Sequence, residues 1–314
     1  MEINKIHNID FLNNELPDKC ANLIIADPPY FEVKGDFDFV WNSFDDYLKD
    51  VEKWAIECKR ILADNGSLFW YGDRKKIAYT QVILDKYFDF QNHIYWQKSE
   101  KCQMEMFDTL RSFYCRGFER ILFYSNKEKY NLSKCIYHIR DYIREEIIKS
   151  KGKVILKEVN KVLGTATNGG GVASSCLSLD KTEPTMITKE MYEKLQHWCK
   201  PYLRKEYEEL RKEYEELRRP FNNYLKLSDH WFFTQGNSNS FDHDTVKPEK
   251  LTRVLINTCS RKDDLVIVPF AGSGTECAMS VKEGRRFVGF EIESKYVKIG
   301  QERVDKILKQ PTLF

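Results

Sequence analysis

Two short motifs near opposite ends of the chain each follow an apolar run of the kind that forms a buried strand. The motif Asp27-Pro28-Pro29-Tyr30 follows residues 21–26, and the motif Phe270-Ala271-Gly272-Ser273-Gly274-Thr275 comes one residue after residues 265–268. Each is a weak signal alone, because short motifs and glycine turns recur by chance. Their order and their shared context predict one active site built from both ends of the chain.

Helices and strands are predicted to alternate on both sides of a long central segment. The first strand is followed by an amphipathic helix with Ser43 as its N-cap and Asn65-Gly66 as its stop. Strands are predicted over residues 21–26, 67–71, 90–96, 119–125, 265–268 and 287–290, and further helices over 75–86, from Pro248, from the glycine turn to Glu283, and from Ser294. This order is typical of an α/β fold with a doubly wound, Rossmann-like sheet.

The alternation stops after about Asn126 and resumes near residue 240. We therefore predict one α/β domain made of residues 1–125 and 240–314, with residues 126–239 as an inserted, mainly helical module. The module contains a tandem duplication that places five apolar residues on one predicted helical seam: Leu203, Tyr207, Leu210, Tyr214 and Leu217. Two heptads are too few to indicate a coiled coil, so packing within the module is favoured over a homodimer contact.

Composition excludes several classes of protein. With 42% hydrophobic and 31% charged residues, no apolar stretch of about 18 residues and no signal-peptide pattern, the chain is expected to be soluble and cytoplasmic, without a membrane partner. Nine cysteines without a Cys-x-x-Cys pair indicate neither a disulfide framework nor a zinc site, and no metal is expected.

The charge of the chain is balanced overall but not locally. A net charge of +2 does not by itself indicate a nucleic-acid partner. Residues 134–161 carry eight Lys or Arg against four acids, a local charge of +4. On charge alone this stretch is interpreted as an ordinary solvated face.

The C-terminal motif has the layout of a nucleoside-binding βαβ unit. Glu291 lies 19 residues beyond Gly272, close to the spacing of about 20 expected for a carboxylate that binds a ribose. A dinucleotide fingerprint would have its third glycine at Cys277, so a nucleoside without a pyrophosphate fits better. The alternative is a tight strand-to-helix turn beside an exposed acid.

The N-terminal motif suits a planar base that carries an amine. Its prolines restrict the backbone, so the Asp27 carboxylate and the Pro28 carbonyl are placed to accept from one ligand, and Tyr30 offers an aromatic ring. An exocyclic amine is a poor nucleophile, and two acceptors on its protons would stabilise the positive charge that develops on nitrogen. The alternative is a rigid loop that closes a strand.

The motifs together resemble the S-adenosylmethionine-dependent DNA amino-methyltransferases of the beta group. The resemblance rests on residues 22–30, on His243 to Pro248 and on Pro269 to Thr275, and it spans about residues 1–125 and 228–307. It implies a methyltransferase sheet, with the inserted module as the target-recognition region. An Asp at the first position of the tetrapeptide favours N6-adenine over N4-cytosine in this family.

The resemblance also implies a role for each matching residue. Asp27, Pro28, Pro29 and Tyr30 would be catalytic and hold a flipped base, with Tyr30 stacking on it. In cofactor binding, Asp10 would lie near the adenine and Glu291 would bind the ribose. The other residues implied to bind the cofactor are Asp27, Thr245, Lys247 and Phe270 to Thr275. Many relatives have an acid where this chain has Val268, so the resemblance does not extend to a contact with the methionine amino group through that acid.

We therefore predict a site-specific DNA methyltransferase that moves a methyl group from S-adenosylmethionine to N6 of adenine in double-stranded DNA, with a restriction endonuclease as a candidate partner. The nearest alternatives are an N4-cytosine or RNA methyltransferase. A noncatalytic DNA-binding protein is kept open by Val268. A dinucleotide-dependent oxidoreductase is disfavoured by Cys277 and by the absence of a paired His and Arg near a strand end.

Overall fold

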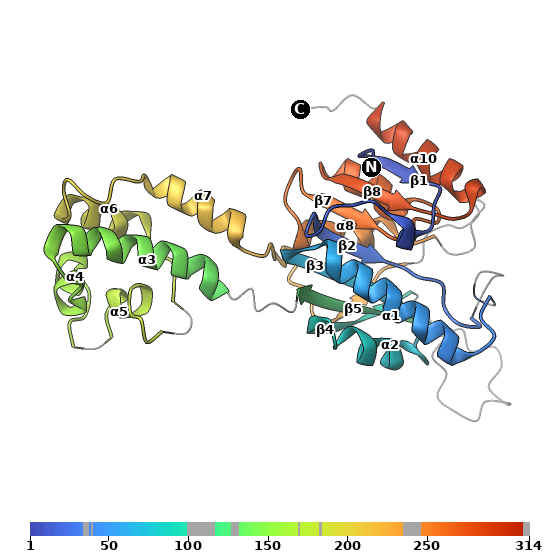
Figure 1. Cartoon of the computed structure of the whole chain (residues 1–314), viewed down its shortest axis with the longest axis horizontal. Helices are drawn as coiled ribbons and strands as arrows, with labels where there is room; N and C mark the ends of the chain where they lie inside the picture. The colour runs from blue at the N-terminus through green and yellow to red at the C-terminus, as the bar shows by residue number, and fades with distance from the viewer. Residues whose placement is uncertain are drawn as a thin grey trace. The chain divides into compact units, whose positions relative to one another are not determined.

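The structure, a computed structural model, divides the chain into two compact units (Figure 1). It describes residues 1–33, 38, 40–98, 117–126, 132–168, 170–181, 184–234 and 246–309. Unit 1 comprises Met1–Glu128 and Pro220–Phe314, and unit 2 comprises Lys129–Arg219. The inserted module was predicted to end at residue 239, but β6 (His230–Phe232) pairs with the sheet of unit 1, so residues from Pro220 onward belong there.

Unit 1 is built on one eight-stranded sheet with the order β1-β8-β7-β2-β3-β5-β4-β6. Strand β5 runs antiparallel to its two neighbours, whereas all other neighbouring pairs are parallel. The other strands are β1 (Lys5–His7), β2 (Ala21–Ala26), β3 (Leu62–Gly72), β4 (Phe88–Gln97), β5 (Phe118–Asn126), β7 (Leu265–Val268) and β8 (Arg286–Phe290).

Helices cover both faces of this sheet (Figure 1). On one face, apolar residues of α1 (Phe44–Ile61) and α2 (Ile77–Leu84) pack on the sheet together with the short helix η1 (Phe11–Asn13). The other face is covered by α8 (Glu249–Cys259), α9 (Thr275–Lys282) and α10 (Ser294–Leu308). Two-sided burial explains the nearly continuous apolar runs of the parallel strands. The predicted doubly wound α/β fold is confirmed.

The strand order reverses between β7 and β2, which are neighbours in the sheet. The chain leaves β7 toward β8 on one side and leaves β2 toward β3 on the other. Ligands of open α/β sheets bind outside the carboxyl ends of the strands at such a reversal. Both sequence motifs follow these two strands, so the fold brings the two ends of the chain to one edge.

One local prediction in unit 1 is wrong. Asn65-Gly66 does not stop helix α1, which ends at Ile61, and instead lies inside β3. The pairing of β2 with β3 shifts register between Ala21 and Leu23, and a Cβ on Gly66 would lie 2.5 Å from the Leu62 side chain. The glycine therefore serves an irregularity within the strand.

Unit 2 is a helical unit with its own apolar core. Its helices are α3 (Leu132–Lys151), α4 (Leu156–Leu163), α5 (Val172–Cys176), α6 (Lys189–Trp198) and α7 (Tyr207–Leu217). Leu203 was predicted to begin the helix of the duplication, but it lies before α7 with a positive φ of 58° and is buried. Tyr207 and Leu210 are buried in the same core, so the seam packs within its own unit as favoured.

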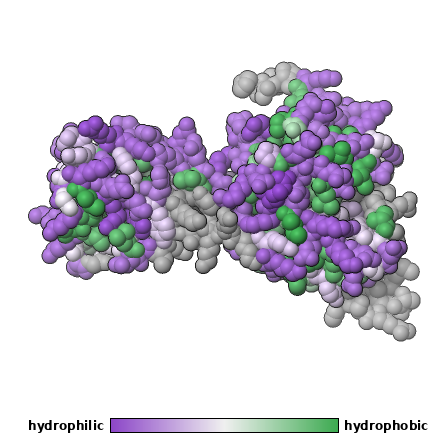
Figure 2. All heavy atoms as spheres, viewed as in Figure 1, coloured by the Kyte–Doolittle hydropathy of each residue, from purple (hydrophilic) through white to green (hydrophobic). Residues whose placement is uncertain are grey.

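On the face shown in Figure 2, the coloured surfaces of both units are mostly hydrophilic. Figure 2 shows apolar residues in small separate groups on the visible face. Among the described residues, no helix combines the length and the apolar character that crossing a membrane requires.

Candidate active site

The Asp27 carboxylate lies at the carboxyl end of β2 and accepts a hydrogen bond on each oxygen. The Tyr30 hydroxyl donates to Oδ1 over 2.7 Å, and the Lys247 ammonium donates to Oδ2 over 2.5 Å. The backbone N–H of Tyr30 donates to Asp38, which anchors the loop after the two prolines. The aspartate is therefore held in one orientation by donors from both ends of the chain.

Lys247 is a buried cation at the centre of this cluster. Its side chain is only 6% exposed, and its Nζ lies 4.9 Å from the centroid of the Tyr71 ring and 3.7 Å from Glu119 Oε2. Lys98 pairs with the other oxygen of Glu119. Lys247 directly precedes Pro248, the N-cap residue of α8, and this position fixes where its stem enters the site.

The environment favours the charged forms of Lys247 and Glu119 and the neutral form of Tyr30. Burial opposes the charge on Lys247, but Asp27 and Glu119 outweigh burial and hold the pKa of its ammonium above its usual value. Burial also opposes the charge on Glu119, yet Lys247 and Lys98 lower the pKa of that carboxyl. Burial, with Asp27 nearby, raises the pKa of Tyr30 well above its usual value, so its hydroxyl remains a donor.

The glycine turn after β7 is tied to the end of β8. Gly272 N–H donates to Glu291 Oε2 over 2.8 Å, and Glu293 N–H donates to Oε1 over 2.9 Å. Burial raises the pKa of Glu291, and these N–H groups act in the opposite direction. The predicted proximity of Glu291 to the first turn is observed; its role as ribose ligand stays a prediction.

Gly274 has a structural reason to be glycine. Its φ is +72°, and a Cβ there would lie 2.6 Å from the Cα of Gly300 in α10. The close approach of α10 alone therefore demands glycine at this position.

Ser273 and Thr275 are also engaged within the protein. Arg303 of α10 donates to the Thr275 hydroxyl over 2.8 Å and to the Ser273 carbonyl over 3.5 Å, and it pairs with Glu249 at 2.8 Å. Both residues are buried, and Ala271 in the same turn donates its N–H to the Phe290 carbonyl. These contacts fix the turn, and any contact of these residues with a cofactor stays a prediction.

The remaining predicted cofactor residues gather at the same edge of the sheet. Phe270 packs against Trp54 and Phe11, with ring centroids 5.0 and 6.3 Å apart. Asp10 is exposed at the start of η1, where its carboxylate accepts from the Leu12 N–H over 2.8 Å. Asn8, two residues earlier, donates to the carbonyls that follow β8, so the Asp10 loop lies beside the Glu291 segment.

Two further positions, Thr245 and Val268, contribute no observed polar group to this site. Thr245 lies outside the described residues, so the structure says nothing of its place. Val268 is buried at the end of β7 and offers no acid. Asp263 and Asp264 do not replace it, because they precede the opposite end of the same strand.

Four residues of this region escaped sequence reasoning: Lys98, Tyr71, Glu119 and Glu276. Glu119 lies in Phe118-Glu119-Arg120, a weaker match to the family for which no site role was predicted, and Glu276 directly follows the glycine turn. The Tyr71 hydroxyl is buried and makes no hydrogen bond to any described residue. A buried hydroxyl without a partner among these residues, beside acids and a strand reversal, fits a site for a polar ligand such as the nucleoside donor predicted from the sequence.

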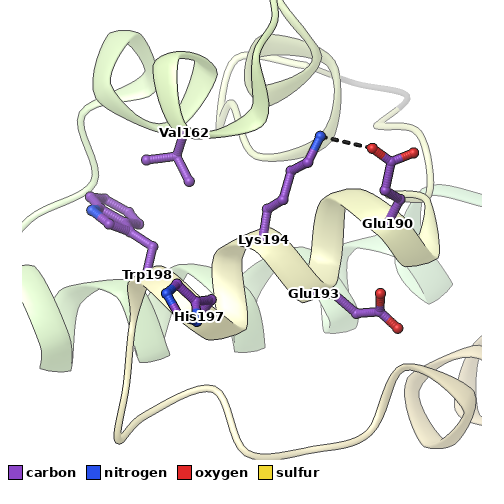
Figure 3. Close-up of a pocket in the computed structure, with 6 residues that line it drawn as sticks. All are labelled: Val162, Glu190, Glu193, Lys194, His197 and Trp198. Carbon is purple, nitrogen blue, oxygen red and sulfur yellow. Dashed lines mark hydrogen bonds and ion pairs between the residues drawn. The ribbon is translucent and has the colours of Figure 1, made fainter.

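A hollow lies on the surface of unit 2, between α4 and α6 (Figure 3). It is lined by Val162, Glu190, Glu193, Lys194, His197 and Trp198, and Lys194 is already paired with Glu190 at 2.8 Å. None of the predicted site residues lies here. The lining offers no arrangement of nucleophile and base, so we assign no chemistry to it.

The basic stretch of unit 2 has two parts. Arg140 and Arg144 donate to the Ser178 and Leu177 carbonyls and so support the unit's own loop. The side chains of five lysines are instead exposed: Lys149, Lys151, Lys153, Lys157 and Lys161. Among the described side chains of the stretch, these exposed lysines are the ones placed to meet a large anionic partner, although Lys149 also pairs with Glu146.

Comparison with known proteins finds one matching family and several similar proteins. Residues 21–302 match the family described as DNA methylase. The Type II methyltransferase M1.MboII of Moraxella bovis is 26% identical over 312 residues, covering 95% of each chain. The DNA adenine methyltransferase YhdJ of Escherichia coli (strain K12) is 25% identical and covers 93% of this chain and 78% of its own.

Solved structures have the same fold. A putative DNA modification methylase from Thermus thermophilus, complexed with S-adenosyl-L-methionine, superposes with a TM-score of 0.54 at 17% identity, covering 97% of this chain and 96% of its own. The sequence and family matches confirm the resemblance that the two motifs predict.

Proposed function

We propose that this chain, which belongs to the DNA methylase family, methylates the exocyclic N6 amine of adenine at a specific site in double-stranded DNA. The predicted methyl donor, S-adenosylmethionine, is confirmed by family membership. The observation that carries the proposal is the Asp27 carboxylate, fixed by Tyr30 and Lys247 at the strand reversal beside the glycine turn.

Adenine is favoured over the alternatives. Asp27 stands at the first position of the tetrapeptide, and YhdJ carries the name of a DNA adenine methyltransferase. The family assignment and these relatives support an enzyme rather than a noncatalytic DNA-binding protein, and DNA rather than RNA.

The residues of the chain supply positioning and charge stabilisation. The N6 lone pair would form a bond to the donor's methyl carbon as the carbon–sulfur bond breaks, the electron pair of that bond would stay on sulfur, and the proton would pass from nitrogen to solvent. Asp27 need not remove that proton early, because the amine becomes acidic as it gains the methyl group. Acceptors on Asp27 and on the Pro28 carbonyl align the amine and stabilise the charge that develops there.

Substrate recognition is assigned to unit 2. We propose that its exposed lysines contact phosphates and set register, while other elements of the unit read base edges. The names of relatives such as M1.MboII as Type II methyltransferases support a restriction endonuclease partner. A DNA substrate also supports the predicted cytoplasmic location. Sedimentation of the purified chain tests whether it forms a homodimer.

Nucleoside analysis tests the proposal. The purified chain is incubated with unmethylated DNA and methyl-labelled S-adenosylmethionine, and the digested nucleosides are analysed by mass spectrometry. We expect label in N6-methyladenine, and sequencing of the product then gives the recognised site. Label in N4-methylcytosine, or in RNA but not DNA in a parallel reaction, would contradict the proposal.

A further inference from the structure

Glu276 is a buried carboxylate that no cation of the described residues pairs with, in contrast to the paired acids around it. It is the second residue of α9 and is 4% exposed. Among the described residues, the one side chain that donates a hydrogen bond to its carboxylate is the Thr252 hydroxyl, at 3.5 Å. Neither Lys247 nor Arg303 comes within ion-pair distance of it there. A buried acid is costly unless something compensates its charge.

The charges around Lys247 leave one negative charge in excess. Lys98 pairs with Glu119 and Lys247 pairs with Asp27, so two lysines balance two of the three acids. Glu276 is the third: burial and the nearby Asp27 raise the pKa of Glu276, and Glu276 in turn contributes to the raised pKa values of Tyr71 and Lys247. The ionised cluster therefore attracts a ligand with one net positive charge.

S-adenosylmethionine carries that charge. Its sulfonium and its ammonium are positive and its carboxylate is negative, which sums to one positive charge. We propose that Glu276 provides the counter-charge for the positively charged end of the methyl donor, at the turn where Val268 supplies none. The inference rests on the proposed function and names a further donor-binding residue for it.

Donor binding through Glu276 depends on pH. Burial, followed by the nearby Asp27, raises the pKa of Glu276 to about 7, so without the donor this acid is partly protonated at neutral pH. Binding of a cation favours the ionised form, so donor binding releases a proton and strengthens as pH rises through about 7. Below that pH the neutral acid no longer attracts the donor.

Other groups facing Glu276 do not account for such a dependence. Thr252 of α8 does not titrate, and Glu249 of α8 is paired with Arg303 of α10. The pKa of Tyr71 in β3 and of Cys277 in α9 lies well above neutral because both are buried. Strand β7 has no titratable residue, and Arg286, at the far end of β8, donates to a backbone carbonyl. Asp27 and Lys247 are paired with each other. Burial also raises the pKa of Glu291, but this residue is present in both wild type and Glu276→Gln, so its effect cancels from their difference.

Calorimetry on the full chain tests the inference with wild type and Glu276→Gln. From pH 6 to 7.5 we expect the wild-type affinity for S-adenosylmethionine to rise about five- to tenfold more than that of Glu276→Gln. The donor's own amine titrates equally in both proteins and cancels. Near pH 7, buffers of different ionisation heat should show that wild type releases about half a proton more on donor binding than the variant does.

Asp264→Asn is the matched control. Burial also raises the pKa of Asp264, but this acid lies at the opposite end of β7, so its removal should leave the pH profile of donor binding unchanged. Thermal unfolding checks that Glu276→Gln is folded; its midpoint at pH 7.5 should equal or exceed that of wild type, because a neutral side chain is easier to bury.

A second ligand identifies which charge Glu276 meets. S-adenosylhomocysteine keeps the ammonium but lacks the sulfonium, so an equal effect on both ligands assigns the ammonium, and an effect on the methylated donor alone assigns the sulfonium. If Glu276→Gln binds the donor like wild type across the pH range, Glu276 is not a counter-charge, while the proposed function stands if DNA is still methylated. A wild-type chain that binds no donor would contradict both.

Discussion

The charged residues of the unit 1 site and of the unit 2 surface lie in opposite environments. Lys247 is 6% exposed and donates to Asp27, whereas Lys149 is 56% exposed and pairs with Glu146 one helical turn away. Buried pairs are little affected by salt, while exposed charges are screened within about 10 Å at 0.1 M salt. Unit 1 therefore uses charge to fix geometry, and we expect unit 2 to use it for salt-dependent attraction.

Replacement of the buried cation Lys247 should have the largest effect, on both stability and methylation. Lys247→Met leaves Asp27, which is partly buried, without its cation and leaves Glu119 with Lys98 alone, so the free energy of unfolding should fall by about 3 kcal/mol. Methylation should also fall at least about tenfold, because the orientation of Asp27 is lost. Urea unfolding at low and high salt measures the first effect, and both salts should give a similar loss.

Lys250→Met is the matched control, since Lys250 is exposed on the same helix α8. It should change stability by less than about 0.5 kcal/mol. If Lys247→Met lowers the free energy of unfolding and methylation no more than this control does, the ion pairs of Lys247 with Asp27 and Glu119 do not organise the site.

Removal of exposed cations from unit 2 should have a smaller, salt-dependent effect. With Lys149, Lys151, Lys153 and Lys157 all changed to Ala, DNA binding should weaken and the plot of log affinity against log salt should become shallower by up to about 4. Methylation at saturating DNA should stay unchanged, since none of these residues belongs to the site. Filter binding across a salt series measures the slope.

The paired lysines Lys49 and Lys53 of α1 provide a comparison for that variant, because each is exposed and lies beside an acid three residues away. Their replacement should leave the slope as it is. An unchanged slope in the four-lysine variant would show that these lysines do not contact DNA. They would then form an ordinary solvated face, as charge alone indicates.

Local sequence signals predicted the elements that meet the site. Ser43 caps α1 through the Asp46 N–H as expected, and the strands before both motifs lie where the apolar runs place them. These signals succeed because capping and two-sided burial act over a few residues. Asn65-Gly66 misled because the pairing of β3 with β2 overrides a local turn signal.

Contacts between distant segments could not be read from the sequence. Glu119 and Lys247 are 128 positions apart, and only the sheet brings Lys98, Tyr71 and Glu276 to the same edge. Likewise, the end of the inserted module depends on β6 joining β4, a pairing of short strands without a motif. Lys247 was predicted among cofactor residues, yet its ammonium lies on Asp27, a contact that only the fold reveals.

The central claim is that the loop after β2 handles the acceptor amine while the turn after β7 handles the donor. Measurement of both turnover and S-adenosylmethionine affinity in Asp27→Ala tests it most directly. We predict a loss of turnover of about 100- to 1000-fold at saturating DNA and donor, with donor affinity changed by less than about threefold. DNA methylation at the wild-type rate, or a loss of donor binding large enough to account for the lost turnover, would contradict the claim.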